Sequence, residues 1–243
     1  MKKKSLGLIC AGLLVLGQAG MAQAALVDRG GGMIYDNLLD VTWLQDANYA
    51  QTSGYDVDGK MNWNDATAWV AGLTYGGYSD WRLPTANPIN GSSYSYGLSY
   101  AGTTDYGYNI GAPGTLYAGS TANELAHMFF TSLGNIAYRA TNGSYPQPGY
   151  GLSNVDLFTN LQAAAYWTGS DYGTGAAATT AAWNFNNNSG YQNAVYKSST
   201  EDYVWVVRSG DVALAPVPLP AAVWLFGTAL AGLGLFGRNK RRG

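Results

Sequence analysis

The chain is poor in cysteine, histidine and charge: of its 243 residues one is cysteine, one is histidine, and 12% are charged. Cys10 lies in an apolar run, Leu6 to Leu16, between a basic start at residues 2–4 and the sequence Ala22-Gln23-Ala24. Such a basic start, short apolar run and small-x-small site are typical of a secretory signal peptide, so we expect residues 1–24 to be cleaved. The mature protein would then have no disulfide, no thiolate nucleophile and no zinc held by cysteine.

Groups for acid–base or nucleophilic catalysis are also scarce. We expect His127, the one histidine, on a helix face or in the core, and no nucleophile-elbow motif accompanies it. The two glutamates are Glu124 and Glu201, and we expect Glu124 in the first turn of a helix, where the dipole favours it. A glycosidase needs two carboxylates that flank the bond, and no spacing among the aspartates identifies such a pair. We therefore expect a protein that is not an enzyme, with a polysaccharide hydrolase as the weakest alternative.

Positive charge is concentrated at the two ends of the chain. Seven of the 13 basic residues lie in residues 2–4 and 238–242. Without these ends, six basic residues face all 15 acidic ones, a net charge of about −9. Such a domain repels nucleic acid and polyanionic polysaccharide at long range. We therefore expect no nucleic-acid partner, while neutral glycans and partners bridged by cations remain open.

The C-terminal tail, residues 217–243, reads VPLPAAVWLFGTALAGLGLFGRNKRRG. Residues 221–237 carry no charge and as a helix would span about 26 Å, which is at the lower limit for crossing a membrane. The basic residues that follow are expected to stay in the cytoplasm, which places the domain outside the inner membrane. On these grounds alone, a permanent single-pass anchor is one explanation of the tail.

The tail also resembles PEP-CTERM sorting signals, in the variant that begins VPLPA. In that family an exosortase, a membrane transpeptidase of Gram-negative bacteria that make exopolysaccharide, reads the signal. The resemblance implies a transient helix at residues 221–237, processing by the exosortase, and delivery to the cell surface or extracellular matrix. Leu219 stands where other members have glutamate, which implies a variant sortase. The residues implied in recognition and in stopping transfer are Pro218, Leu219, Pro220, Arg238, Lys240, Arg241 and Arg242.

Residues 25–211 are expected to form one exported α+β domain, joined to the tail by a short linker at 212–216. Asn62 and either Thr121 or Asn123 are typical helix N-caps, each followed by apolar residues at helical spacing. These patterns predict two helices packed on a mainly antiparallel sheet. The predicted strands lie at 33–35, 41–44, 166–168, 182–185 and 203–207, with a hairpin turn at 186–190. Residues 87–120, rich in Gly, Ser and Tyr, are expected to form a long surface loop.

Four segments of this domain are similar to a known family. They read MNWNDATAWVAGLTYGGYSDWRLPT from residue 61, NELAHMFFTSLGN from 123, FTNLQAAAYWTGS from 158 and WVVRSGD from 205. They resemble the domain first named from the C-terminal region of a collagen-like bacterial adhesin. The resemblance implies a C-type-lectin-like fold and glycan binding. Its named member binds sulfated glycans through positive charge, which this acidic domain lacks, so we do not expect that ligand here. Arg82 is expected to brace a loop through planar hydrogen bonds.

Aromatic residues offer the best candidates for binding, because sugar CH faces stack on rings while amides meet hydroxyls. The chain has eight tryptophans and 19 tyrosines. The glycan-binding candidates are Trp167, Tyr172, Trp183 and Tyr191, and further tyrosines crowd the expected loop at positions 94, 96, 100, 106 and 108. The alternative is that the tryptophans form the core and the tyrosines pack on the surface.

A calcium site is open at Asp56-Val57-Asp58-Gly59, although the EF-hand pattern is not completed and a solvated acidic turn is the alternative. We expect no other cofactor. The sequence as a whole predicts a non-enzymatic surface or matrix protein that binds exopolysaccharide or another glycan. A structural envelope protein without glycan affinity is the alternative.

Overall fold

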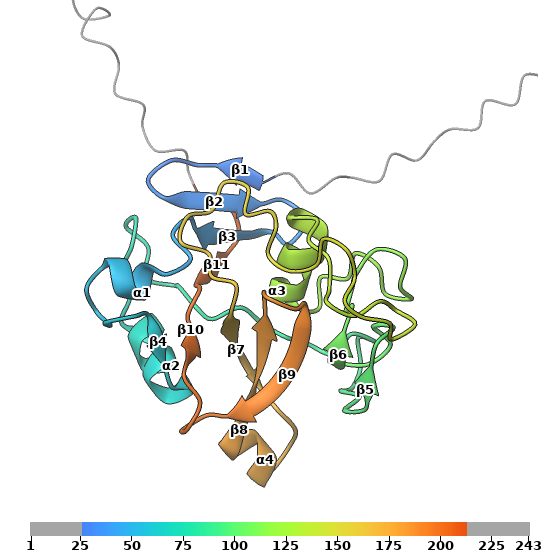
Figure 1. Ribbon diagram of the computed structural model, residues 1–243. Helices are drawn as coiled ribbons and strands as arrows, with labels where there is room; N and C mark the ends of the chain where they lie inside the picture. The colour runs from blue at the N-terminus through green and yellow to red at the C-terminus, as the bar shows by residue number, and fades with distance from the viewer. Residues whose placement is uncertain (1–25, 213–243) are drawn as a thin grey trace, which may run out of the picture.

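The computed structural model describes residues 26–212, which form an α+β structure with two sheets and short helices (Figure 1). The predicted signal peptide at 1–24 and sorting tail at 217–243 lie outside the described residues, so both stay predictions. Within 26–212, no helix has the length and apolar character needed to cross a membrane.

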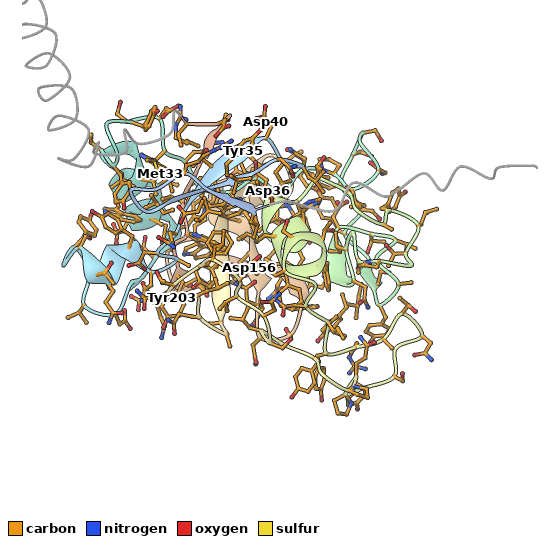
Figure 2. All side chains as sticks on the ribbon, turned by 90° about the horizontal axis from the view of Figure 1, so that it is seen from above. Met33, Tyr35, Asp36, Asp40, Asp156 and Tyr203 are labelled. Carbon is orange, nitrogen blue, oxygen red and sulfur yellow. The ribbon has the colours of Figure 1, made fainter. Side chains whose placement is uncertain are left out.

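The first sheet has four antiparallel strands in the order β1-β2-β3-β11. They are β1 (Leu26–Asp28), β2 (Met33–Asp36), β3 (Val41–Leu44) and β11 (Val207–Ser209). Figure 2 looks onto this end of the molecule, with Met33, Tyr35 and Asp36 labelled on β2. Asp36 Oδ1 accepts hydrogen bonds from the amides of Leu38 and Leu39 and so closes the turn between β2 and β3.

The second sheet has seven strands in the order β4-β10-β7-β8-β9-β6-β5. They are β4 (Lys60–Met61), β10 (Asp202–Tyr203), β7 (Ala165–Asp171), β8 (Ala181–Asn186), β9 (Tyr191–Tyr196), β6 (Tyr106–Tyr108) and β5 (Leu98–Ser99). The β10–β7 and β5–β6 pairs are parallel and the others are antiparallel. The β8–β9 pair is the hairpin that the polar turn predicts.

The predicted strand at 203–207 is wrong as a single strand, because its two ends belong to different sheets. Tyr203 pairs with β4 and β7, whereas Val207 pairs with Trp43 of β3. Between them, residues 204–206 are buried and carry the chain from one sheet to the other. A continuous apolar run is typical of a buried strand, and it looks the same when the burial comes from crossing between two sheets.

Helix α2 (Trp63–Ala71) and helix α3 (Glu124–His127) begin at the predicted caps, and α3 continues as the π-helical turn η1 (Met128–Ser132). Asn62 Oδ1 accepts from the amides of residues 64 and 65, and Asn123 Oδ1 from the amide of Ala126. The prediction of two helices is incomplete, because α1 (Tyr49–Thr52) and α4 (Ala176–Thr180) are also present. Both are too short to leave a periodic pattern in the sequence.

Residues 87–120 are mainly irregular, and they contain two short strands that their composition does not predict. They add β6 and β5 to one edge of the seven-stranded sheet. The buried carboxylate of Asp105 accepts hydrogen bonds from the amides of Ile89, at 2.6 Å, and Ser95, at 2.7 Å, and so ties distant parts of the segment together. Strands of two or three residues leave too little alternation for the sequence to reveal them.

Two hydrophobic clusters form the core. Tyr166 and Trp167, neighbours on β7, belong to different clusters, because successive side chains of a strand point to opposite faces. The first cluster joins both sheets to α3 and includes Trp43, Phe129, Phe185 and Trp205. The second lies against α2 and includes Trp69 and Trp81.

Arg82 joins the four-stranded sheet to α3. Its amide and carbonyl pair with Val207 of β11, at 2.8 and 2.9 Å. Its guanidinium donates two parallel hydrogen bonds to Glu124, both at 2.7 Å, and Glu124 also accepts from the amide of Thr85 at 2.6 Å. The predicted loop-bracing role of Arg82 is confirmed, and so is the place of Glu124 in a first helical turn. The pairing of these two residues, 42 positions apart, was not predicted.

The neighbours of Arg82 in the GGYSDWRLPT segment also serve the fold. Asp80 accepts two hydrogen bonds from Arg208, both at 2.9 Å, and the Arg208 guanidinium lies 4.0 Å from the centre of the Tyr78 ring. The indole of Trp81 donates to the carbonyl of Tyr75. This part of the family segment therefore joins residues that are distant in the sequence.

We predict that Arg82→Ala lowers the free energy of unfolding by about 3 kcal/mol, because it leaves the Glu124 carboxylate buried without its partner. Arg82→Lys should lose less, since it keeps the charge but not the two parallel hydrogen bonds. Denaturant unfolding of the purified protein measures both. Lys60→Ala removes a more exposed cation and is the control, and an Arg82→Ala variant as stable as this control would contradict the prediction.

Candidate functional site

A pocket lined by tyrosines borders α4. Figure 1 shows α4 at the end of the molecule away from the four-stranded sheet. Its volume is about 430 Å³, which is within the range of small-molecule sites. Tyr96 and Tyr106 come from the 87–120 segment, and Tyr172 follows β7. The remaining lining residues come from α4 and the outer ends of β8 and β9: Ala177, Thr180, Ala181, Ala194, Val195 and Tyr196. None of these side chains is charged.

Three of the lining tyrosines, Tyr96, Tyr106 and Tyr172, pack against the ring of Trp183. This tryptophan is fully buried, with the Tyr172 ring edge-on at 4.9 Å and the Tyr96 ring stacked at 6.2 Å between centroids. Tyr96 and Tyr196 are 42% and 67% exposed, so their faces are open to a ligand. Because aromatic contacts hold Tyr96 and Tyr172 in place, a ligand would meet a partly preformed surface.

Lys197 holds the α4 wall of the pocket against the sheet. Its ammonium group donates to Asp171 Oδ1 at 2.6 Å and to the carbonyl of Ala178 at 2.7 Å, and it lies 3.9 Å from the centre of the Trp63 ring. The Lys197 amide also donates to the carbonyl of Thr180. A buried cation with these partners fixes the short helix that borders the pocket.

Two tyrosines beside the pocket, Tyr94 and Tyr191, have raised pKa values. Burial raises the pKa of Tyr94, whose hydroxyl donates to the carbonyl of Ala86 at 2.6 Å. Burial and the hydrogen bond with Tyr106 raise the pKa of Tyr191. Both hydroxyls therefore add no negative charge beside the pocket.

The structure brings some of the predicted glycan-binding residues together and separates others. Tyr172 lines the pocket and Trp183 lies beneath it. Tyr191 lies on β9 beyond the lining and contacts Tyr106 and Tyr108. Trp167 is not a candidate, because it is fully buried in the cluster facing α2 and its indole donates to the carbonyl of Met61.

Tyr196, the most exposed ring of the pocket, was missed. It lies at the end of β9, where the hairpin register pairs it with Ala181 of β8. The predicted hairpin turn could have pointed to it, since counting outward from the turn places residue 196 opposite residue 181. The sequence does not show that α4 and the 87–120 segment meet at this place.

The calcium candidates Asp56 and Asp58 serve as turn residues. Asp56 Oδ1 accepts from the amides of residues 58 and 59, and Asp58 Oδ1 accepts from the amide of Lys60. Over residues 26–212, the structure gathers no group of three or more His, Cys, Asp or Glu side chains that could hold a metal ion. Both carboxylates thus act as hydrogen-bond acceptors within the turn at 56–60.

His127 is buried in α3, with Nδ1 at 3.0 Å from the carbonyl oxygen of Ser120. Glu124, one turn earlier, is bound by Arg82. Neither residue lines the tyrosine pocket. Both side chains therefore take part in the packing of α3, as the sequence predicts for His127.

Comparison with known proteins identifies the family. The family model described as the Lcl C-terminal domain matches residues 32–208, and the chain belongs to this family. No curated protein and no solved structure matches the chain. Membership is consistent with a protein of the cell surface or the extracellular space.

We predict that Lys197→Met frees α4 while leaving the rest of the fold intact. The methionine keeps the packing on Trp63 but loses the bonds to Asp171 and Ala178, and Asp171 is exposed enough to be hydrated. The loss of global stability should be only about 1 kcal/mol, whereas amide hydrogen exchange in residues 176–180 should accelerate about tenfold. Unchanged exchange there would show that Lys197 does not hold the helix. Lys60→Met is the matched control.

Proposed function

We propose that this member of the Lcl C-terminal domain family is a non-enzymatic protein of the cell surface or extracellular matrix that binds exopolysaccharide or another glycan. The observation that carries the proposal is the uncharged pocket with exposed tyrosine rings on a buried tryptophan. A C-type-lectin-like arrangement of the domain is part of the proposal.

The chemistry of the pocket suits a sugar. Pyranose rings present CH groups that pack on aromatic faces, and Tyr96 and Tyr196 offer such faces. The hydroxyls of the lining tyrosines can both donate to and accept from sugar hydroxyls. A pocket without charge avoids the cost of removing water from an ion when a neutral ligand enters.

The place of the pocket supports a role in capturing material outside the cell. The described chain begins in β1 and ends just after β11, both in the four-stranded sheet. The pocket borders α4, which lies at the opposite end of the molecule (Figure 1). Asp211, near the last described residue, is tied to Arg29, near the first. A domain held through its C-terminal side would therefore present the pocket away from the membrane.

The sorting route completes the proposal. A signal peptide at 1–24 would export the chain, and the tail at 217–243 would hold it in the inner membrane until an exosortase processes it. The support comes from the sequence of the tail, with its Pro218-Leu219-Pro220 entry, uncharged run and basic end. The non-enzymatic part of the proposal is supported by His127 and Glu124, which are engaged in the packing of α3.

The pocket is tested by truncating its exposed rings. We predict that Tyr96→Ala and Tyr196→Ala each weaken binding to the organism's own exopolysaccharide about fivefold, which corresponds to on the order of 1 kcal/mol per ring. Affinity electrophoresis or retention on the immobilised polymer measures the effect. Tyr55→Ala is the control, because Tyr55 is 58% exposed and lies outside the pocket.

Three outcomes separate the candidate functions. Equal weakening by all three variants would contradict the role of the pocket. A folded parent protein that passes unretained would favour the structural envelope protein. New reducing ends in the polymer would favour the hydrolase.

The sorting route is tested at its proline motif. We predict that replacing Pro218 and Pro220 by alanine leaves the full-length chain in the membrane fraction, because the exosortase no longer reads the tail. Cell fractionation followed by mass spectrometry of the C-terminus measures this. Pro113→Ala is the control. A mature parent protein that retains residues 221–243 would show that the tail is a permanent anchor.

A further inference from the structure

Arg139 differs from the other basic residues of the domain. The five other basic residues within 26–212 pair with a carboxylate: Arg29 with Asp211, Lys60 with Asp58, Arg82 with Glu124, Lys197 with Asp171 and Arg208 with Asp80. Arg139 has no carboxylate within 4.0 Å in this part of the chain, although the domain contains 15 acidic residues. Its charge is therefore open to an anion from outside.

Three tyrosines surround the Arg139 guanidinium. Its central carbon lies 3.8 Å from the centre of the Tyr145 ring, 5.0 Å from that of Tyr100 and 6.0 Å from that of Tyr108. Nη1 donates to the carbonyl of Gly143 at 3.0 Å. Within the described residues, Nε and Nη2 have no hydrogen-bond partner. Nε and Nη2 of the planar guanidinium are thus free to bind the two oxygens of a planar anion.

The backbone around Arg139 is held firmly. Its carbonyl accepts from the side-chain amides of Asn109 and Gln147, at 2.8 Å each. The backbone amide of Gln147 donates to the carbonyl of Tyr138. Backbone hydrogen bonds of Ala140 with residues 143 and 144 close the turn between Tyr138 and Gln147. A guanidinium that is already positioned by rings and by its own backbone loses little freedom when it binds a ligand.

A row of aromatic contacts connects Arg139 to the tyrosine pocket. Tyr108, beside the guanidinium, lies 4.6 Å from Tyr191, which lies 5.8 Å from Tyr106 between ring centroids. Tyr106 lines the pocket and contacts Trp183. On the other side of Arg139, Tyr145 and Tyr150 are 57% and 42% exposed, and Tyr138 contacts both rings. A chain of sugar residues lying along this row would reach from the pocket to the cation.

We propose that Arg139 binds the carboxylate of a hexuronate residue in the polysaccharide whose other residues occupy the tyrosine pocket; this rests on the function proposed above. The fork of the guanidinium matches a carboxylate, and the exposed face of Tyr145 takes the CH groups of the sugar that carries it. The domain's net charge of about −9 repels a dense polyanion at long range. The ligand is therefore a mainly neutral polysaccharide with occasional hexuronate residues.

The test compares the organism's exopolysaccharide with the same polymer after chemical reduction of its carboxyl groups to alcohols. For the full chain at about 0.15 M salt, we expect carboxyl reduction to weaken binding about tenfold, the size of a lost charge-assisted hydrogen-bonded pair. Arg139→Gln should bind the native polymer about tenfold more weakly than the parent protein does. It should bind the reduced polymer as well as the parent protein does. Arg139→Lys should fall between them, because it keeps the charge and loses the fork.

Control variants distinguish the loss of the Arg139 contact from the loss of one positive charge and from unfolding. Lys60→Gln removes the same charge outside the tyrosine pocket, beside Tyr203, and should bind both polymers as the parent does. An unchanged thermal unfolding midpoint shows that Arg139→Gln is folded, and Arg139→Lys gives the answer if it is not. Free glucuronate should compete far less well than the native polymer, which distinguishes a polymer residue from a small carboxylate as the ligand.

The results also distinguish this proposal from the one on which it rests. Binding of both polymers with equal affinity, or an Arg139→Gln variant that binds the native polymer as the parent does, overturns the role of Arg139 and leaves the tyrosine pocket standing. If free glucuronate competes as well as the polymer, the site takes a small carboxylate instead. If the folded parent binds neither polymer, the proposed function fails and this inference fails with it.

Discussion

The ion pair between Arg82 and Glu124 is the contact on which the rest of the structure depends. The backbone of Arg82 pairs with β11, and its guanidinium donates two hydrogen bonds to Glu124 in the first turn of α3. One residue thus links the four-stranded sheet to the helix that packs against the seven-stranded sheet. Without disulfides in the described domain, such buried polar contacts between distant segments complement the hydrophobic core. The family segment around Arg82 is therefore explained by the fold, and the candidate binding residues lie elsewhere.

In this domain tyrosines, rather than charged residues, stabilise irregular surface segments and offer a surface for ligands. The domain has few charges and many tyrosines, and those of the 87–120 segment pack on Trp183 and on one another. A phenol ring can bury its face and keep its hydroxyl in water, so one residue type stabilises irregular backbone and also offers a surface for ligands. For this reason the stability of the segment and the shape of the pocket cannot be separated: both rest on the same rings.

Local signals predicted the local structure. Asn62 and Asn123 cap helices as expected, because a cap depends on residues two or three positions away. The turn at 186–190 predicted its hairpin for the same reason. The prediction failed for 203–207, where the partners of each half come from different sheets. For 87–120 it did not include the two short strands or the buried Asp105 that order this segment.

By itself the sequence determined the α+β class, the main strands, both helix caps, the acidic charge of the domain and the family signature. Only the tertiary structure decided which aromatic residues face a pocket. Trp167 and Trp183 look alike in the sequence, yet one is enclosed beneath α2 and the other supports the tyrosines. The side of a strand that stays accessible depends on what distant segments cover it. Here α4, the 87–120 segment and β9 meet at one end of the sheet, and their meeting creates the site.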